Sequence, residues 1–281
     1  MEKDMKKELI KFATEIRKNI IISTYYAKSG HPGGSLSCAD YIAYLYMHEL
    51  RIDLQNVQDE ERDRFVLSKG HAAPALYAAL AQKGFFPVED LKTLRKKGSY
   101  LQGHPNMNSV PGCDMTSGSL GQGISAACGM AKGAKILDKD INVYTLLGDG
   151  ECAEGQVWEA ILFASHYKLD NLCIAVDVNG LQIDGSTEEV MNTSPLKEKF
   201  KAFGCNVVSA DGHSFDDLEK AFSSFHRCIG CPTVILLNTI KGKGVSFMEN
   251  SVDWHGKAPN KEEMNEALRE LEEEMKWKLK E

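Results

Sequence analysis

Long hydrophobic runs are absent from this chain of 281 residues. No apolar stretch approaches the ~20 residues that cross a bilayer. The first residues, MEKDMKKELIKFATEI, lack the continuous apolar core of a secretory signal. Long Lys/Arg blocks are absent too, and the net charge is -7 with an isoelectric point near 5.7. These absences argue against a membrane protein and against a dedicated nucleic-acid binder, so we expect a cytoplasmic protein that acts on small molecules or binds protein partners.

A second CxxC motif is also missing. Eight cysteines are scattered along the chain, and only Cys228-Ile-Gly-Cys231 has the spacing of a metal or redox site. A zinc site needs further ligands, which no other CxxC provides, so we interpret this pair as part of the turn before the segment PTVILLNTI. A metal or redox role for the pair stays open at this stage.

The chain does contain enough apolar material for a core, since 43% of its residues are hydrophobic. Short strand-like runs such as INVYTLLG and NLCIAVDV alternate with segments of helical spacing. No internal repeat or linker interrupts this alternation. We therefore predict one α/β domain over residues 1–281, with a doubly wound, largely parallel sheet flanked by helices. In the helical segment WEAILFASHYKL, the spacing predicts four core-facing residues: Ala160, Phe163, Ala164 and Tyr167.

Helical patterns are also found near both ends of the chain. Residues 5–29 predict a long helix that ends at SGHPGG, and a second helix is expected over residues 36–50. The last helix is expected over about residues 260–281, with Asn260 as N-cap and Glu263 as its capping partner. Between these regions, residues 98–123 are rich in Gly, Ser and Asn and predict a long irregular segment.

The most informative pattern is Gly148-Asp149-Gly150, followed by Asn179 in AVDVNGLQIDG. Each of these polar residues follows a strand-like run, and the carboxyl ends of parallel strands meet at one edge of a sheet. Oxygen ligands of this kind suit Mg²⁺, and glycines let backbone N–H groups approach a phosphate. An isolated Gly-Asp-Gly is equally typical of a turn, and Asn-Gly of a hairpin. The combination with the distant Asn179 favours a magnesium-diphosphate site.

Four histidines lie in Gly- or Pro-rich turns. They occur in SGHPGG (His31), SKGHAAP (His71), QGHPN (His104) and DWHGKAP (His255). Each alone is typical of a loop hydrogen bond, and none has the i, i+4 spacing of a metal-binding helix. Turns that follow strands gather at one edge of a doubly wound sheet, so the four histidines are expected near Asp149.

In order and spacing, these segments resemble the N-terminal half of transketolase over about residues 10–260. The resemblance is carried by SGHPGGSLSCADYIAYLY, SKGHAAPALYAAL, GHPN, TSGSLGQG, LLGDGECAEGQVWEA, LDNLCIAVDVNGLQIDG and DWHGKAP. Alpha subunits of 2-oxo-acid dehydrogenases share a Gly-Asp-Gly but lack this set of histidine turns. The resemblance implies thiamine diphosphate, with Mg²⁺ or Ca²⁺ held by the side chains of Asp149 and Asn179 and the carbonyl of Leu181.

The resemblance also implies further roles for individual residues. The diphosphate would be contacted by His71, His255 and the Gly150 amide. Gly118 and Leu120 would meet the aminopyrimidine and thiazolium region.

Other implied roles concern the ring, the substrate and the protein surface. Ile183 would pack against the thiazolium, and the substrate channel, where protons are transferred, would be lined by His31, His104 and His255. Glu154 and Glu159 resemble carboxylates at the family's subunit interface, or else form a solvated helix face. Lys243 and Lys257 add charge near the diphosphate or are ordinary surface lysines.

The implied reaction is transfer of a two-carbon ketol unit from a ketose phosphate to an aldose phosphate, as in the pentose phosphate pathway. Full-length transketolase continues into a pyrimidine-binding domain and a C-terminal domain that this sequence lacks. We therefore expect the N-terminal subunit of a split transketolase, which self-associates and forms a heterotetramer with a separate C-terminal subunit. Two alternatives stay open: a related enzyme for a specialised ketose phosphate or an acyl transfer, and a non-catalytic cofactor-binding protein.

Overall fold

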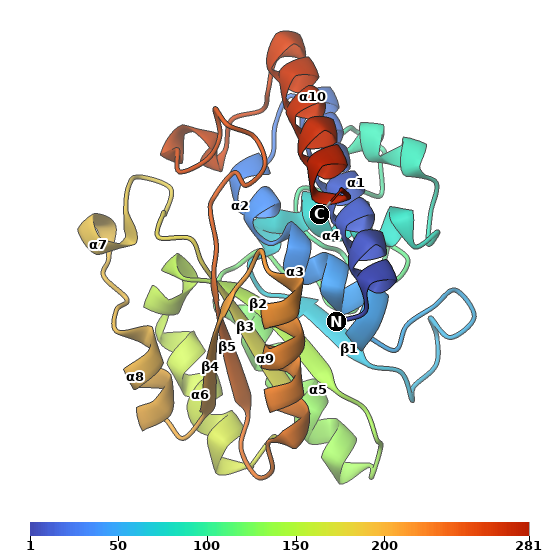
Figure 1. Ribbon diagram of the computed structural model, residues 1–281. Coiled ribbons are helices and arrows are strands. Elements are labelled where there is room, and N and C mark those ends of the chain that lie inside the picture. The colour runs from blue at the N-terminus through green and yellow to red at the C-terminus, as the bar shows by residue number, and fades with distance from the viewer. Residues whose placement is uncertain (281) are drawn as a thin grey trace.

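The computed structural model describes residues 1–280 and contains a five-stranded parallel sheet with helices on both faces (Figure 1). The strand order is β1-β2-β3-β5-β4, and every neighbouring pair is parallel. The predicted fold class, a parallel α/β sheet flanked by helices, is therefore confirmed. The strands are β1 (Arg64–Leu67), β2 (Val143–Gly148), β3 (Leu172–Val178), β4 (Asn206–Asp211) and β5 (Thr233–Asn238).

Ten α-helices are found within the described residues. They are α1 (Lys3–Ala27), α2 (Pro32–Ser37), α3 (Ala39–Tyr44), α4 (Ala73–Gln82), α5 (Gln122–Ile136), α6 (Gly155–His166), α7 (Thr187–Val190), α8 (Leu196–Ala202), α9 (Phe215–Arg227) and α10 (Lys261–Lys278). Short 3₁₀ turns at Gly70–Ala72, Gly150–Ala153 and Val252–His255 lie next to residues of the expected site. None of the helices within residues 1–280 has the length and apolar character needed to cross a membrane.

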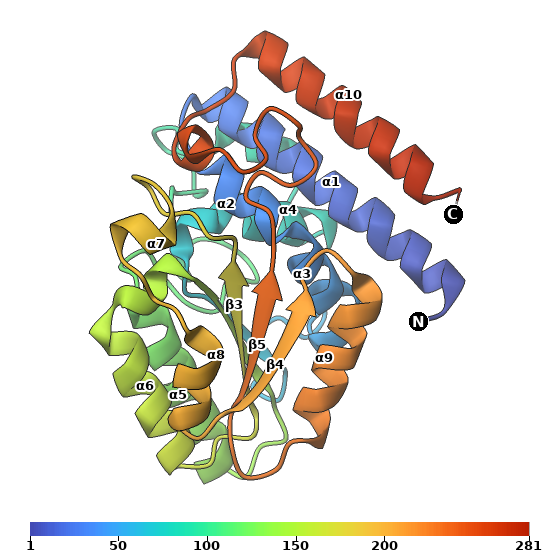
Figure 2. The same ribbon diagram turned by 60° about the vertical axis from the view of Figure 1, so that its left-hand side comes forward.

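Both faces of the sheet are buried, because alternate residues of each strand belong to different hydrophobic cores. Tyr144 and Leu146 of β2 face the core that contains α1, α3, α4 and α9, whereas Val143 and Leu147 face the core that contains α5, α6 and α8. Figure 2 shows these two helix layers on either side of the sheet. Strands that are buried on both faces read as continuous apolar runs, which is why they are recognisable in the sequence.

The first and last helices lie side by side and antiparallel, so both chain ends are on the same side of the molecule (Figure 2). The predicted capping box of α10 is present: Asn260 Oδ1 accepts the Glu263 N–H at 2.9 Å, and Glu263 Oε2 accepts the Asn260 N–H at 2.7 Å. Leu271 is buried in the same core as Leu9 of α1. The long irregular segment is also confirmed, since none of residues 98–121 belongs to a helix or strand.

Two expectations about helices were wrong. The helix expected over residues 36–50 begins earlier, at Pro32, because proline suits the first turn of a helix, and it is divided into α2, α3 and the π-helical turn Leu45–Glu49. In α6, Phe163 and Tyr167 face outward and are 39% and 42% exposed. The helix instead buries Val157 and Ile161 together with Ala160 and Ala164, because its apolar residues form two overlapping stripes.

We predict that Phe222→Ala lowers the free energy of unfolding by about 3–5 kcal/mol, the usual cost of removing a buried aromatic ring. Phe222 of α9 is fully buried, and its ring lies 5.2 Å from that of Tyr44 and 6.1 Å from that of Tyr144. Urea unfolding followed by circular dichroism measures the loss. Leu137→Ala is the control, since Leu137 is 66% exposed. Equal small losses in both variants would contradict the packing described for this face.

Candidate active site

Asp149 lies directly after β2, at the carboxyl edge of the sheet. Gly148 pairs with Asp177 of β3, so the two strands end level with each other. The Asp149 carboxylate accepts the Gly150 N–H at 2.8 Å and the Gly180 N–H at 2.6 Å. Asp149 therefore connects the loop after β2 with the loop after β3.

A cavity of about 390 Å³ opens at this edge, a size typical of ligand sites. Every residue expected to contact the cofactor or the metal lines it: His71, Gly118, Leu120, Asp149, Gly150, Asn179, Leu181, Ile183 and His255. A larger cavity of about 540 Å³ lies between α1, α10 and the start of α9, but none of the expected site residues lines it. The smaller cavity is therefore the candidate active site.

The oxygens at this edge fit a hard divalent cation. The Asp149 carboxylate is only 4% exposed, and its hydrogen bonds within the described residues come from backbone N–H groups rather than from a cation. Burial raises the pKa of Asp149 to about 6, and the charge of Asp177 adds to this rise. A bound cation would offset both effects and favour the ionised carboxylate.

Asn179 and Leu181 provide the other oxygens. The Asn179 amide nitrogen donates to Asp177 Oδ2 at 2.9 Å. The amide oxygen of Asn179, Oδ1, accepts the Leu181 N–H at 3.2 Å. No cluster of three His, Cys, Asp or Glu side chains that could bind a metal exists within residues 1–280. A metal at this edge would therefore need oxygens from a ligand or from water in addition to those of the protein, as is usual for Mg²⁺.

Behind the cavity, Asp177 forms a buried ion pair with Lys69. Lys69 Nζ lies 2.5 Å from Asp177 Oδ2 and also donates to the Gly34 carbonyl at 2.8 Å, and both charged side chains are at most 1% exposed. Burial lowers the pKa of Lys69 and raises that of Asp177, but the charge of the partner and the hydrogen bonds together reverse both effects, so the pKa of Lys69 is raised and that of Asp177 is lowered. Lys69 is therefore charged, but its charge is paired with Asp177 and is not available to a ligand.

Lys241 is the second lysine of the cavity and has no carboxylate within ion-pair distance among the described residues. Its Nζ donates to the Leu181 carbonyl at 3.1 Å and to His255 Nδ1 at 2.9 Å. Burial lowers the pKa of Lys241 to about 8, and the charge of Lys69 contributes to the decrease. Lys241 is therefore mostly protonated at pH 7 and is the cation available to an anionic ligand.

Three of the four histidines form a cluster beside the cavity. The ring centroids of His31, His71 and His255 are separated by 5.3–5.5 Å. Burial lowers the pKa of His31 to about 4 and that of His255 to about 3, helped by Arg95 and Lys241 respectively. Burial, with Lys69, also places the pKa of His71 well below its usual value. The three rings are therefore neutral at pH 7 and can each donate one hydrogen bond.

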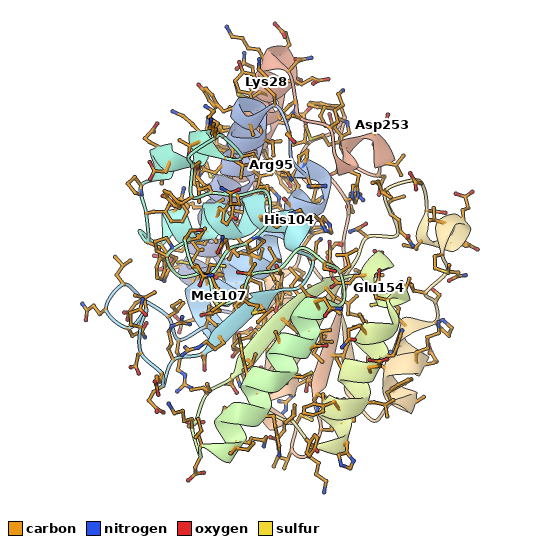
Figure 3. The ribbon with its side chains drawn as sticks, turned by 180° about the vertical axis from the view of Figure 1, so that it is seen from behind. Lys28, Arg95, His104, Met107, Glu154 and Asp253 are labelled. Carbon is orange, nitrogen blue, oxygen red and sulfur yellow. The ribbon has the colours of Figure 1, made fainter. Side chains whose placement is uncertain are left out.

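His104 lies at the edge of the same cluster, behind Gly118. A Cβ on Gly118 would stand 3.1 Å from His104 Cγ, and the φ of +150° at Gly118 disfavours other residues. Burial and the charge of Arg95 lower the pKa of His104. Figure 3 shows Arg95 and His104 near each other on this side of the molecule, with Glu154 next to α6.

The four histidines converge as expected, but not for the expected reason. Only His71 follows a strand closely, after β1; His31 is the N-cap residue just before α2, His104 lies in the long irregular segment, and His255 lies in a 3₁₀ turn far beyond β5. His31 and His104 stand next to the cavity without lining it. The loops that carry these residues pack on the edge of the sheet rather than extending from it.

The other lysines and carboxylates singled out in the sequence lie away from the cavity, with one exception. Lys243 pairs with Glu249 at 3.1 Å and Lys257 with Glu263 at 3.0 Å, and neither lysine lines the cavity. Glu154 lines the cavity and is exposed, and Glu159 is exposed on α6.

Lys69 and Lys241 were not predicted as site residues from the sequence. Each lies in a Gly-rich segment, SKG for Lys69 and IKGKG for Lys241. The only available signal was their position just after β1 and β5.

Cys228 and Cys231 lie in the predicted turn between α9 and β5, with their sulfur atoms 3.3 Å apart. This turn leads into the amino end of β5, opposite the edge that carries the cavity. Burial raises the pKa of Cys231.

A family profile described as the thiamine diphosphate-binding domain of transketolase matches residues 10–278. A 6-deoxy-6-sulfo-D-fructose transketolase subunit, SqwG, from Clostridium sp. (strain MSTE9) is 49% identical over 87% of this chain and 89% of that protein. An apulose-4-phosphate transketolase subunit from Phocaeicola vulgatus is 42% identical over 92% of this chain and 91% of that protein.

The fold is also similar to solved structures. A transketolase variant from Pichia stipitis superposes with a TM-score of 0.88 and 33% sequence identity, over 94% of this chain and 40% of that chain. The chain therefore spans nearly the whole length of the two subunits above, but less than half of this solved chain.

We predict that the His31 ring is neutral at pH 6, whereas the His226 ring is protonated. Burial lowers the pKa of His31 to about 4, while the hydrogen bond to Glu49 raises the pKa of His226 above its ordinary value. Ring nitrogen chemical shifts in an NMR titration from pH 8 to pH 4 distinguish the two. A His31 midpoint near 6.5 would show that the cluster is more open to water than described here.

Proposed function

The chain belongs to the family of transketolase thiamine diphosphate-binding domains, and from this premise we propose that it is the cofactor-binding, N-terminal subunit of a two-chain transketolase. In this proposal, residues 1–281 form a single domain that binds thiamine diphosphate and a divalent cation, Mg²⁺ or Ca²⁺. The supporting observation is the cavity at the edge of the sheet, which is lined by the buried carboxylate of Asp149 and by the buried ammonium of Lys241, the donor to the Leu181 carbonyl.

Opposite charges at this edge suit a metal-diphosphate ligand. Asp149, the Asn179 amide and the Leu181 carbonyl would hold the cation, while Lys241 and the neutral rings of His71 and His255 would hold diphosphate oxygens. Because Lys241 donates to His255 Nδ1, the ring proton of His255 is on Nε2 and is free for a ligand.

When bound, thiamine diphosphate supplies the electron sink that allows a ketose carbon–carbon bond to break. The protein contributes orientation and protons. His31 Nδ1 accepts a hydrogen bond from Arg95 Nη2 at 3.5 Å, so the ring proton of His31 is on Nε2, as it is in His255. His31, His104 and His255 would exchange protons with sugar hydroxyl and carbonyl oxygens, which neutral imidazoles can do at pH 7.

A second chain would complete the active site. The two relatives named as subunits are matched over most of their length, so a partner chain is expected here as well. We propose that this partner is a pyrimidine-binding C-terminal transketolase subunit, in an assembly of two copies of each chain. The exposed Glu154 and Glu159 are candidates for contacts in this assembly.

The substrates are proposed to be sugar phosphates or closely related ketoses. One relative is named for a 6-deoxy-6-sulfo sugar and the other for apulose 4-phosphate, so a specialised ketose is a second candidate that the similarity favours. Substrate profiling of the reconstituted pair would separate these from ordinary pentose phosphates. The cytoplasmic location and the pentose phosphate pathway stay predictions.

We predict that Asp149→Ala abolishes the metal-dependent part of thiamine diphosphate binding, because the replaced carboxylate is the only charged ligand expected for the cation. Calorimetry with and without Mg²⁺ measures this. Asp184→Ala, which removes an exposed carboxylate from the neighbouring loop, is the matched control and should bind normally. Undiminished metal-dependent binding by Asp149→Ala would remove the assignment of the metal site.

We also predict that the purified chain binds the cofactor but performs no ketol transfer until a C-terminal transketolase subunit is added. A coupled assay on the separate and mixed chains measures activity, and light scattering measures the mass of the complex. Full activity of the chain alone would contradict the two-chain proposal. Cofactor binding without activity in the mixture, for every ketose tested, would favour a non-catalytic protein.

A further inference from the structure

Lys241 is held at the cavity by a short segment, residues 239–241, that follows β5. Thr239 continues the sheet, because its N–H donates to the Val178 carbonyl at 3.1 Å, and its hydroxyl donates to Asp177 Oδ1 at 2.5 Å. Beyond Thr239 the sheet ends. On its carboxyl side Lys241 is bound by the Asn250 N–H, which donates to the Lys241 carbonyl at 2.9 Å, and by the Gly242 N–H, which donates to the Gly33 carbonyl at 3.0 Å. On its amino side, the position of Lys241 depends on what binds the backbone of Ile240.

The Ile240 N–H donates to a side chain, His213 Nε2, at 2.9 Å. His213 comes from the turn after β4, the strand next to β5. Gly212 brings this turn against the segment, since a Cβ there would stand 2.5 Å from Thr239 Cγ2, too close for any other residue without a shift. The sequence Asp211-Gly212-His213 thus places one imidazole nitrogen beside one backbone amide.

The other ring nitrogen of His213 is fixed by a buried ion pair. His213 Nδ1 lies 2.8 Å from Asp40 Oδ2, and Asp40 is bound by both terminal nitrogens of Arg17 at 2.8 and 2.6 Å. Because this carboxylate is held as an acceptor by Arg17, the proton of His213 lies on Nδ1, and Nε2 is left as an acceptor. The side chains of Arg17, Asp40 and His213 are 4%, 5% and 11% exposed.

We propose that His213 is a positioning residue, which holds Lys241 in register with the Leu181 carbonyl and His255 through its hydrogen bond to the Ile240 amide. This inference rests on the proposed function, in which Lys241 binds the diphosphate. Without the acceptor, the partly buried Ile240 N–H loses its hydrogen-bond partner, and the amino side of the segment can shift toward other acceptors. The lysine would then move away from the two atoms that it contacts.

The experiment measures the affinity of the full chain for inorganic diphosphate with Mg²⁺ by calorimetry, and its thermal unfolding midpoint. We expect His213→Ala to weaken diphosphate binding about tenfold, the effect of losing one partly buried hydrogen bond. His213→Gln should restore most of the affinity, since its side-chain oxygen reaches the position of Nε2 and can accept the Ile240 N–H. His226→Ala is the control, because His226 also bonds a carboxylate, Glu49 at 2.7 Å, but lies outside the cavity.

A Lys241→Ala background separates positioning from a loss of stability. If His213 acts through Lys241, adding His213→Ala to Lys241→Ala should not weaken diphosphate binding further, although the unfolding midpoint falls in both backgrounds. Equal weakening in both backgrounds would overturn the proposal, as would wild-type affinity in His213→Ala or in Lys241→Ala. Failure of the wild-type chain to bind diphosphate would instead overturn the proposed function itself.

Discussion

The carboxylate of Asp177 connects four segments that lie beneath the candidate active site. It receives Lys69 from the end of β1, Ser37 from α2, Asn179 from the loop after β3 and Thr239 from the end of β5. A buried charge is costly unless it is paired and its remaining lone pairs are filled, and here a cation and three polar groups fill them. If any one donor were removed, the buried Asp177 carboxylate would lack one of its hydrogen bonds. The positions of the four segments therefore depend on one another.

This pairing also determines the charge that a ligand meets. Because Lys69 neutralises Asp177, the carboxylates that line the cavity without an ion-pair partner among residues 1–280 are those of Asp149, Glu151 and Glu154, and Lys241 is the available cation, with neutral histidines beside them. A cation alone would meet the nearby ammonium of Lys241, and an anion alone would meet the carboxylate of Asp149. A ligand that contains both a divalent cation and a diphosphate satisfies both groups at once.

Much of this arrangement could be predicted from the sequence, because it depends on local patterns. Asp149 and Asn179 follow largely apolar runs, and the resemblance of ordered motifs assigned the cavity-lining residues. Lys241 and His213 could not be found this way, because their roles come from contacts between β4, β5 and α3, which are distant in the chain. The outward direction of Phe163 was missed for a different reason, since one-dimensional spacing does not distinguish two apolar stripes on a helix.

The exposure of Ile183 shows which part of a bound ligand this chain leaves uncovered. Ile183 lines the cavity yet is 63% exposed, whereas Asp149 and Lys241, which line the same cavity, are only 4% and 2% exposed. The Asp149 and Lys241 side of the cavity is thus enclosed by this chain, while the Ile183 side is open to water. An aromatic ring bound against Ile183 would keep one face in water unless a second protein surface covered it. The hydrophobic effect favours such a second surface, because it removes the exposed face of the ring from water. Recognition of the ring therefore belongs, in our proposal, mainly to the partner chain, and recognition of the diphosphate belongs to this one.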